Sequence, residues 1–256
     1  MPSNTEINNK FVTISVDDGH ITDLRTAALL AKYSLAATFY IPARNSERPV
    51  MPEDEIRQLA KQFEIGAHTF NHVPLRSLQE QEAWSEIENG KKWLENLLGV
   101  DVPSFCYPQG KFDRQAAALV RKAGFLGGRT CFFNRNDFPA DPFHWGVSTH
   151  AYSHGALVQI RHSLLELNLQ GAWNFFTAFH GATDWENHFL YSLSEVDRYG
   201  GIAHLFLHSW EIENLGHWEK LERVFAAISE RKNFKRVTNG DLFRLRAQNM
   251  HAVAQN

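Results

Sequence analysis

Cysteine is scarce in this 256-residue chain, which contains only Cys106 and Cys131. Two cysteines cannot form a disulfide framework, and their spacing matches no Cys-x-x-Cys metal motif. The chain also lacks an apolar run of about 18 residues, and its first residues lack the basic and apolar regions of a secretion signal. We therefore expect reduced thiols, no membrane span and a cytoplasmic location.

Clustered positive charge is missing as well. The formal net charge is -3, and the lysines and arginines are scattered along the chain. Binding to nucleic acid needs a basic surface that neutralises phosphates. Nucleic acid is therefore excluded as a partner, whereas nothing in the pattern predicts an oligomeric state.

Short apolar runs alternate with helical patterns along nearly the whole chain. Such alternation is typical of βα units around a parallel sheet, and 43% hydrophobic residues suffice for one large core. We expect a single domain over residues 1–256, of α/β class, folded as a distorted (β/α) barrel of about seven to eight parallel strands. The candidate strands are Phe11–Val16, Ala37–Ile41, Glu64–His68, Ser104–Tyr107, Phe125–Phe132, His144–Ser148, Trp173–Phe179, Ile202–His208 and Phe234–Val237.

Two adjacent carboxylates, Asp17 and Asp18, stand at the end of the first candidate strand and precede Gly19. Consecutive side chains on an extended segment point in different directions. One carboxylate can therefore bind a metal ion while the other faces a water or a substrate. Taken alone, the Asp-Asp-Gly run is more typical of an ordinary turn.

Two imidazoles, His68 and His72, follow the third candidate strand. Their four-residue spacing brings both rings to one side of a helical turn. Together with one carboxylate, two neutral imidazoles form a three-ligand site that leaves coordination positions open for water and substrate. We expect one divalent metal ion there, with zinc preferred and cobalt, manganese, iron or nickel as alternatives.

Four segments carry a further pattern, in order along the chain: Ser15–Gly19, His68–His72, Phe105–Asp113 and Ile202–Trp210. The pattern resembles the polysaccharide deacetylase (NodB-homology) family of carbohydrate esterases. The corresponding family motifs are Thr-Phe-Asp-Asp-Gly, His-Ser/Thr-x-x-His, a Phe-x-Tyr-Pro-x-Gly-x-x-Asp variant, and Leu-x-His. The matches extend over residues 11–210.

The resemblance implies a role for each matching side chain. Asp17 would be the general base, and Asp18, His68 and His72 would be the metal ligands. His208 would be the general acid. The chemistry agrees with these roles, because a bound cation lowers the pKa of its water and an imidazole can protonate a leaving amine near neutral pH.

Further contacts are expected around this centre. The resemblance implies that the backbone N–H of Gln109 faces the oxyanion and that Tyr107 and Pro108 contact the substrate. Trp210 could stack on a sugar ring, although a packed tryptophan is the simpler interpretation. His180, which follows the candidate strand Trp173–Phe179, is another possible substrate contact.

The sequence departs from the family at two places. Many members carry an arginine that orients the base carboxylate where this chain has Cys106. We hypothesise that Arg129, on the next candidate strand, replaces it, although an arginine in a surface loop is an equally good interpretation. The aspartate that tunes the acid histidine also has no clear counterpart, and Asp141 and Asp184 are the candidates.

These residues favour a metal-dependent deacetylase that hydrolyses an N-acyl amide, by preference N-acetyl. Because no secretion signal is visible, the expected substrate is a small, lipid-linked or nucleotide-linked amino sugar rather than extracellular chitin or mature peptidoglycan. A deformylase or another non-peptide C–N hydrolase is the nearest alternative. A non-haem iron oxygenase and a catalytically silent carbohydrate-binding relative are the alternatives from other classes.

Overall fold

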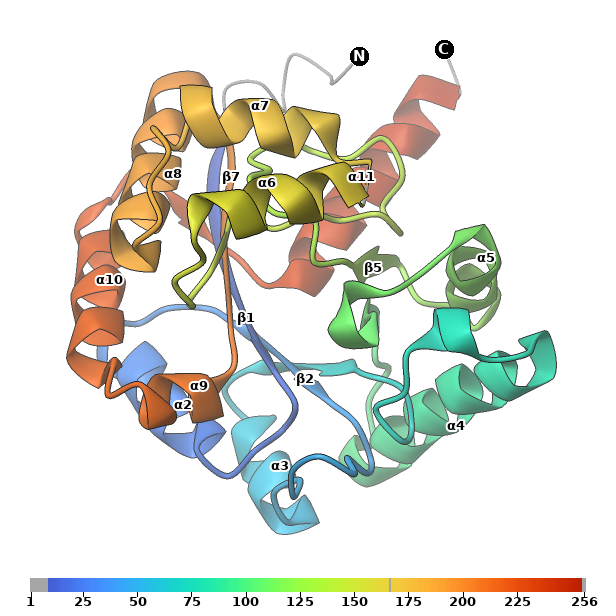
Figure 1. Cartoon of the computed structure of the whole chain (residues 1–256). Coiled ribbons are helices and arrows are strands. Elements are labelled where there is room, and N and C mark those ends of the chain that lie inside the picture. Colours follow the sequence, from blue (N-terminus) through green and yellow to red (C-terminus); the bar gives the residue numbers. More distant parts are fainter. Residues whose placement is uncertain (1–8, 166, 255–256) are drawn as a thin grey trace.

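A curled, all-parallel sheet forms the centre of the computed structural model, which describes residues 9–165 and 167–254 (Figure 1). Its eight strands are ordered β5-β4-β3-β2-β1-β7-β6, and β8 pairs with β1. The α/β class and the distorted barrel of parallel strands expected from the sequence are confirmed. The strands are β1 (Lys10–Asp17), β2 (Thr38–Ile41), β3 (Glu64–Ala67), β4 (Ser104–Cys106), β5 (Gly127–Arg129), β6 (Thr149–His150), β7 (Gly201–Leu207) and β8 (Lys235–Arg236).

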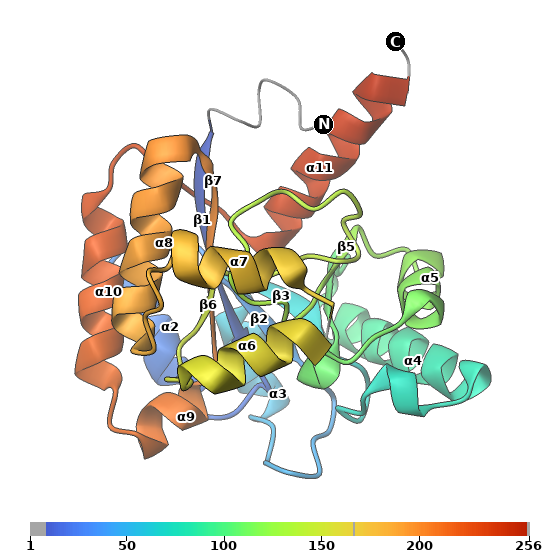
Figure 2. The ribbon, with the colours of Figure 1, turned by 45° about the horizontal axis from the view of Figure 1, so that its top comes forward.

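Helices surround this sheet, and α6 and α7 lie side by side near β6 (Figure 2). Within the described ranges, no helix is both long enough and apolar enough to cross a bilayer. The α-helices are α2 (Asp23–Lys32), α3 (Glu53–Leu59), α4 (Glu80–Leu98), α5 (Arg114–Lys122), α6 (Ala156–Leu165), α7 (Leu169–Thr177), α8 (Trp185–Tyr199), α9 (Ser209–Asn214), α10 (Trp218–Glu230) and α11 (Asn239–Ala254), and the short 3-10 helices are Leu75–Ser77 and Pro108–Gly110.

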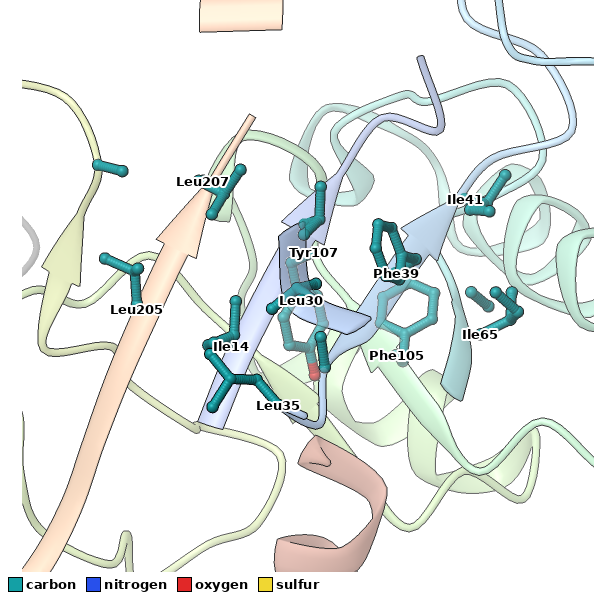
Figure 3. Close-up of a cluster of buried hydrophobic side chains, with 14 of the residues drawn as sticks. Ile14, Leu30, Leu35, Phe39, Ile41, Ile65, Phe105, Tyr107, Leu205 and Leu207 are labelled. Carbon is teal, nitrogen blue, oxygen red and sulfur yellow. The ribbon is translucent and has the colours of Figure 1, made fainter. Parts of the chain in front are cut away.

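The hydrophobic core lies around the central strands. Seven of the eight residues of β1 are buried, as expected for a parallel strand covered on both faces. Ile14, Phe39 and Leu205, from three adjacent strands, belong to one buried cluster (Figure 3). Burying each such side chain contributes roughly 1.5–3 kcal/mol, so the core fixes the strand ends from which the polar residues project.

The segment between β5 and β6 was expected to be the strand His144–Ser148, and this prediction is wrong. Regular pairing is restricted to β6, which is only two residues long. The backbone N–H of Trp145 nevertheless donates to Gly128 O at 3.0 Å, and that of Ser148 donates to His204 O at 3.0 Å. An irregular segment therefore joins β5 to β7 and bridges the two sides of the curled sheet.

The expected strand Trp173–Phe179 is also wrong, because most of it lies in α7. Asn168 caps this helix by accepting a hydrogen bond from the first turn. Phe175 is buried whereas Trp173 is 70% exposed, which is the arrangement of an amphipathic helix.

Helix α4 supports the loop that carries His68 and His72. The Glu86 carboxylate accepts hydrogen bonds from the backbone N–H groups of Phe70 and Asn71, at 3.0 and 2.8 Å. One turn further along, Gly90 lies directly against this loop: a Cβ atom there would come within 2.9 Å of the carbonyl carbon of Thr69. A glycine is therefore needed for the close approach of helix and loop.

We expect Gly90→Ala to destabilise the protein, although glycine to alanine in a helix ordinarily stabilises by about 1 kcal/mol. The added methyl group must displace the backbone at Thr69. Urea denaturation should show a lower free energy of unfolding for this variant, with Asn89→Ala as the control because Asn89 is exposed on the same helix. A more stable Gly90→Ala variant would contradict the packing described.

Candidate metal centre and active site

Four non-glycine residues near the strand ends adopt the left-handed backbone conformation. Their φ angles are 81° at Asp18, 60° at Thr69, 55° at His72 and 55° at Gln109. Each such conformation costs about 1–3 kcal/mol for a side-chain-bearing residue and is concentrated at functional sites. All except Thr69 line the same cleft.

The Asp18, His68 and His72 side chains converge in this cleft. Asp18 Oδ1 lies 3.0 Å from His72 Nε2 and 3.7 Å from His68 Nε2. His68 Nδ1 is 2.9 Å from the Cys106 carbonyl oxygen. A carbonyl can only accept, so Nδ1 carries the proton and the Nε2 lone pair faces the other two side chains.

The donor atoms of this trio suit a divalent cation. All three lie within 4.8 Å of one another, and the buried Asp18 Oδ1 faces the Nε2 atoms of both imidazoles. A second possible donor set, Asp17, His68 and Cys106, overlaps with it. Cys106 is fully buried and does not line the cleft, so an ion and its substrate could reach the Asp18 set more easily.

The neighbouring carboxylate, Asp17, is held from behind by Arg129. The guanidinium forms a buried ion pair with Asp17 Oδ2, and the Cys106 thiol donates to the same oxygen at 3.4 Å. Burial alone would raise the pKa of Asp17, but Arg129 and nearby imidazoles outweigh it and hold that pKa below its ordinary value. Asp17 Oδ1 is buried without a hydrogen-bond partner in the described part of the chain.

His208, which also lines the cleft, is oriented by Glu211. His208 Nδ1 is 2.8 Å from Glu211 Oε2, and His208 Nε2 is 3.9 Å from Asp18 Oδ2. His208 is the N-cap of α9, so a residue three positions later lies beside it in the first helical turn. Burial favours the neutral ring, yet Glu211 and the nearby aspartates raise the pKa of His208 above its ordinary value.

The cleft has a volume of about 370 Å³. Trp210 is among its walls and donates its indole N–H to Asp18 Oδ2 at 2.9 Å. The Arg48 guanidinium lies 3.4 Å from the Trp210 ring centroid. One indole face is therefore covered by Arg48, and the indole N–H is engaged by Asp18. Stacking of Trp210 on a sugar stays a prediction.

Comparison with known proteins points to the same family as the sequence motifs. The family model described as polysaccharide deacetylase matches residues 4–127, just under half of the chain. The predicted resemblance to the polysaccharide deacetylase family is thereby confirmed. The chain is 27% identical to the polysaccharide-deacetylase-like protein YxkH of Bacillus subtilis over 124 residues, which are 47% of this chain and 44% of that protein.

Two further comparisons extend the deacetylase resemblance. The chain is 28% identical to the peptidoglycan-N-acetylglucosamine deacetylase of Bacillus cereus over 146 residues, 56% of this chain and 65% of that protein. It therefore spans less than two thirds of the length of both curated relatives. A family 4 acetyl xylan esterase from Clostridium thermocellum, solved with a cobalt ion, shares the fold with a TM-score of 0.58 at 16% identity, covering 92% of this chain and 91% of that one.

Three residues predicted as substrate contacts lie apart from the cleft. Tyr107 is buried and its hydroxyl donates to Phe143 O at 3.2 Å, and neither Tyr107 nor Pro108 lines the cleft. His180 follows α7 and contacts the Tyr191 ring instead. The structure therefore does not bring these three side chains to the wall of the cleft.

The two aspartates considered as partners of the acid histidine are engaged elsewhere. Asp141 pairs with Arg121 at 2.9 Å, and Asp184 caps α8 and pairs with Lys220 at 2.6 Å. The carboxylate that contacts His208 Nδ1 is that of Glu211. Its signal in the sequence was the three-residue spacing from His208 at the start of a helix.

His150 was also missed as part of this site. Its Nε2 atom is 2.8 Å from Glu211 Oε2, and its Nδ1 atom is 3.1 Å from His154 Nε2. Both rings line the cleft. No local pattern separates these histidines from solvated ones, because the contact depends on the pairing of β6 with β7.

Proposed function

We propose that this protein is a metal-dependent deacetylase that hydrolyses the N-acetyl amide of an amino-sugar-containing substrate. The supporting observation is the convergence in one cleft of a three-donor set, a second carboxylate and an imidazole. The deacetylase activities named for the matched relatives support the same reaction class. The cobalt ion in the Clostridium thermocellum structure supports the metal dependence.

Asp18, His68 and His72 would hold one divalent cation, with zinc preferred, and such a cation polarises an acyl carbonyl and lowers the pKa of a water. Asp17 would take the proton of that water. Its Oδ2 atom is occupied by Arg129, so Oδ1 is the oxygen left to accept the proton. Arg129 thereby keeps the carboxylate ionised and fixed in direction.

His208 would protonate the leaving amine from its Nε2 atom. The bond from Nδ1 to Glu211 fixes the ring and stabilises its protonated form. The backbone N–H of Gln109, in its left-handed conformation at the rim, is the proposed donor to the oxyanion. Base and acid would then act from two sides of one acyl group.

A small, lipid-linked or nucleotide-linked amino sugar remains the proposed substrate, in keeping with the proposed cytoplasmic location. The cleft volume of about 370 Å³ is at the lower end of the range for small-molecule sites, roughly 300–1,000 Å³. It favours recognition of one or two sugar units around the acyl group.

The decisive experiment combines metal analysis with product release. Purified protein should contain close to one divalent ion per chain and release acetate from a panel of N-acetylated amino sugars, and a chelator should abolish that release. The double variant His68→Ala, His72→Ala should lose both the ion and the activity. His180→Ala is the matched control, because this imidazole is exposed and does not line the cleft.

The same panel separates the alternatives. Release of formate rather than acetate would identify a deformylase. Sugar binding without turnover in metal-loaded protein would identify a silent binding relative. Absence of a bound ion under all loading conditions would refute the proposed function.

Arg129 can be tested as the positioning residue for Asp17. We expect Arg129→Lys to lower kcat by about 100-fold, because a lysine cannot reproduce the planar contact and small misplacements of a catalytic group are costly. Circular dichroism should establish that the variant is folded before the kinetics are compared. Partial recovery in the double variant Cys106→Arg, Arg129→Ala would show that the guanidinium acts on Asp17; unchanged kcat in Arg129→Lys would contradict this role.

Trp210 can be tested as a support of the metal ligand Asp18. We expect Trp210→Phe, which removes the indole donor, to weaken zinc binding by roughly 10-fold. Zinc affinity measured by competition with a chromophoric chelator provides the readout. Trp84→Phe, at a tryptophan of α4 that packs against Lys122 of α5, should leave the affinity unchanged. Equal affinities in both variants would argue against the support.

A further inference from the structure

A second group of metal-type donors lies on the acid side of the cleft. Glu211 Oε2 is 2.8 Å from both His150 Nε2 and His208 Nδ1. The donor atoms of these three residues all lie within 4.8 Å of one another. They share no ligand with the set formed by Asp18, His68 and His72.

The spacing of these atoms is close to that of a zinc site. Zinc binds imidazole nitrogen and carboxylate oxygen at about 2.0–2.2 Å, so tetrahedral ligands are roughly 3.4 Å apart. The two nitrogen–oxygen distances of 2.8 Å would need to lengthen by only about half an ångström to admit the ion. His154, 3.1 Å from His150, supports the outer side of the cluster.

The cluster can be reached and carries the right charge. His150, His154 and His208 all line the cleft. Glu211 supplies one carboxylate oxygen that faces both imidazole nitrogens, which is a donor set that zinc binds. The contact between Glu211 and His208 is sufficient to orient the His208 ring. The contact of His150 with the same Glu211 oxygen is not needed for that orientation.

We propose that His150, His208 and Glu211 form a second zinc site, weaker than the first, whose occupation inhibits the hydrolysis. Binding there replaces two hydrogen bonds, which lowers its affinity. With a cation on Nδ1, His208 retains a single proton on Nε2 and is no longer an imidazolium. It therefore cannot protonate the leaving amine. The binding stands on the geometry alone, whereas the inhibition rests on the proposed function.

Zinc stoichiometry tests the site independently of any activity. Protein dialysed against buffered zinc should contain one ion per chain at low free zinc and two at high free zinc. His150→Ala should contain one throughout, and the double variant His68→Ala, His72→Ala should still gain an ion at high free zinc. His180→Ala, which alters an exposed imidazole outside the cleft, should bind two like the unmodified protein.

The inhibition is tested by the rate of acetate release, which is measured for each protein with one bound ion and again in excess zinc. Excess zinc should lower acetate release about 10-fold in the unmodified protein and leave the ratio near one in His150→Ala. A single ion at every zinc concentration, or a second ion retained in His150→Ala, would overturn the site. Two ions without inhibition would overturn the inhibitory role. Absence of release at one ion would reject the proposed function and leave the stoichiometry to decide the second site.

Discussion

Two like charges buried side by side at the end of β1 are the constraint around which the site is built. Asp17 and Asp18 are only 3% and 4% exposed, where lost hydration and mutual repulsion both favour uptake of a proton. The surrounding side chains reverse that preference. Arg129 pairs with the first carboxylate, and His72 and Trp210 contact the second. Ionised carboxylates at this depth are therefore a property of the assembled fold and not of the Asp-Asp run.

The assembled fold also fixes the directions of these groups. Asp18 and His72 both have positive φ angles, and such a conformation persists only where the surroundings over-determine it. For Asp18, its backbone N–H donates to Tyr40 O of the adjacent strand at 3.1 Å. For His72, the preceding loop is anchored by Glu86 of α4. Contacts with β2 and α4 therefore fix the backbone from which these closely spaced donor atoms project.

What could be predicted from sequence follows from how local each signal is. The Asp17-Asp18 pair and the His68–His72 run are short contiguous segments at strand ends, so a local motif identifies these residues. The expected helical turn at His68–His72 is wrong, because Thr69 and His72 have positive φ angles. The run Trp173–Phe179 failed because continuous apolar residues do not distinguish a buried strand from an amphipathic helix. Its helix was decided by a tertiary environment that buries Phe175.

The acid side was harder to predict, because its partners meet only through the sheet. Glu211 follows His208 by three residues and had a local signal, but His150 comes from β6, which is only two residues long. Pairing of that strand with β7 sets His150 beside Phe206 in the register, with the two rings stacked at 4.5 Å. A contact of this kind depends on the path of an irregular segment and leaves no periodic trace in the sequence.

Cys106 and Arg129 show how a departure from a motif can be compensated across the sheet. The two residues are paired neighbours in the register of β4 and β5, so their side chains start at the same level below Asp17. A small thiol on β4 leaves space for the long side chain from β5, whose guanidinium then reaches the carboxylate that an arginine on β4 would contact. Arg129 is fully buried and its guanidinium lies 4.3 Å from the Phe206 ring centroid. Its charge is therefore shielded from water and is compensated by Asp17. In this chain the guanidinium at Asp17 is therefore supplied by β5 and not by β4.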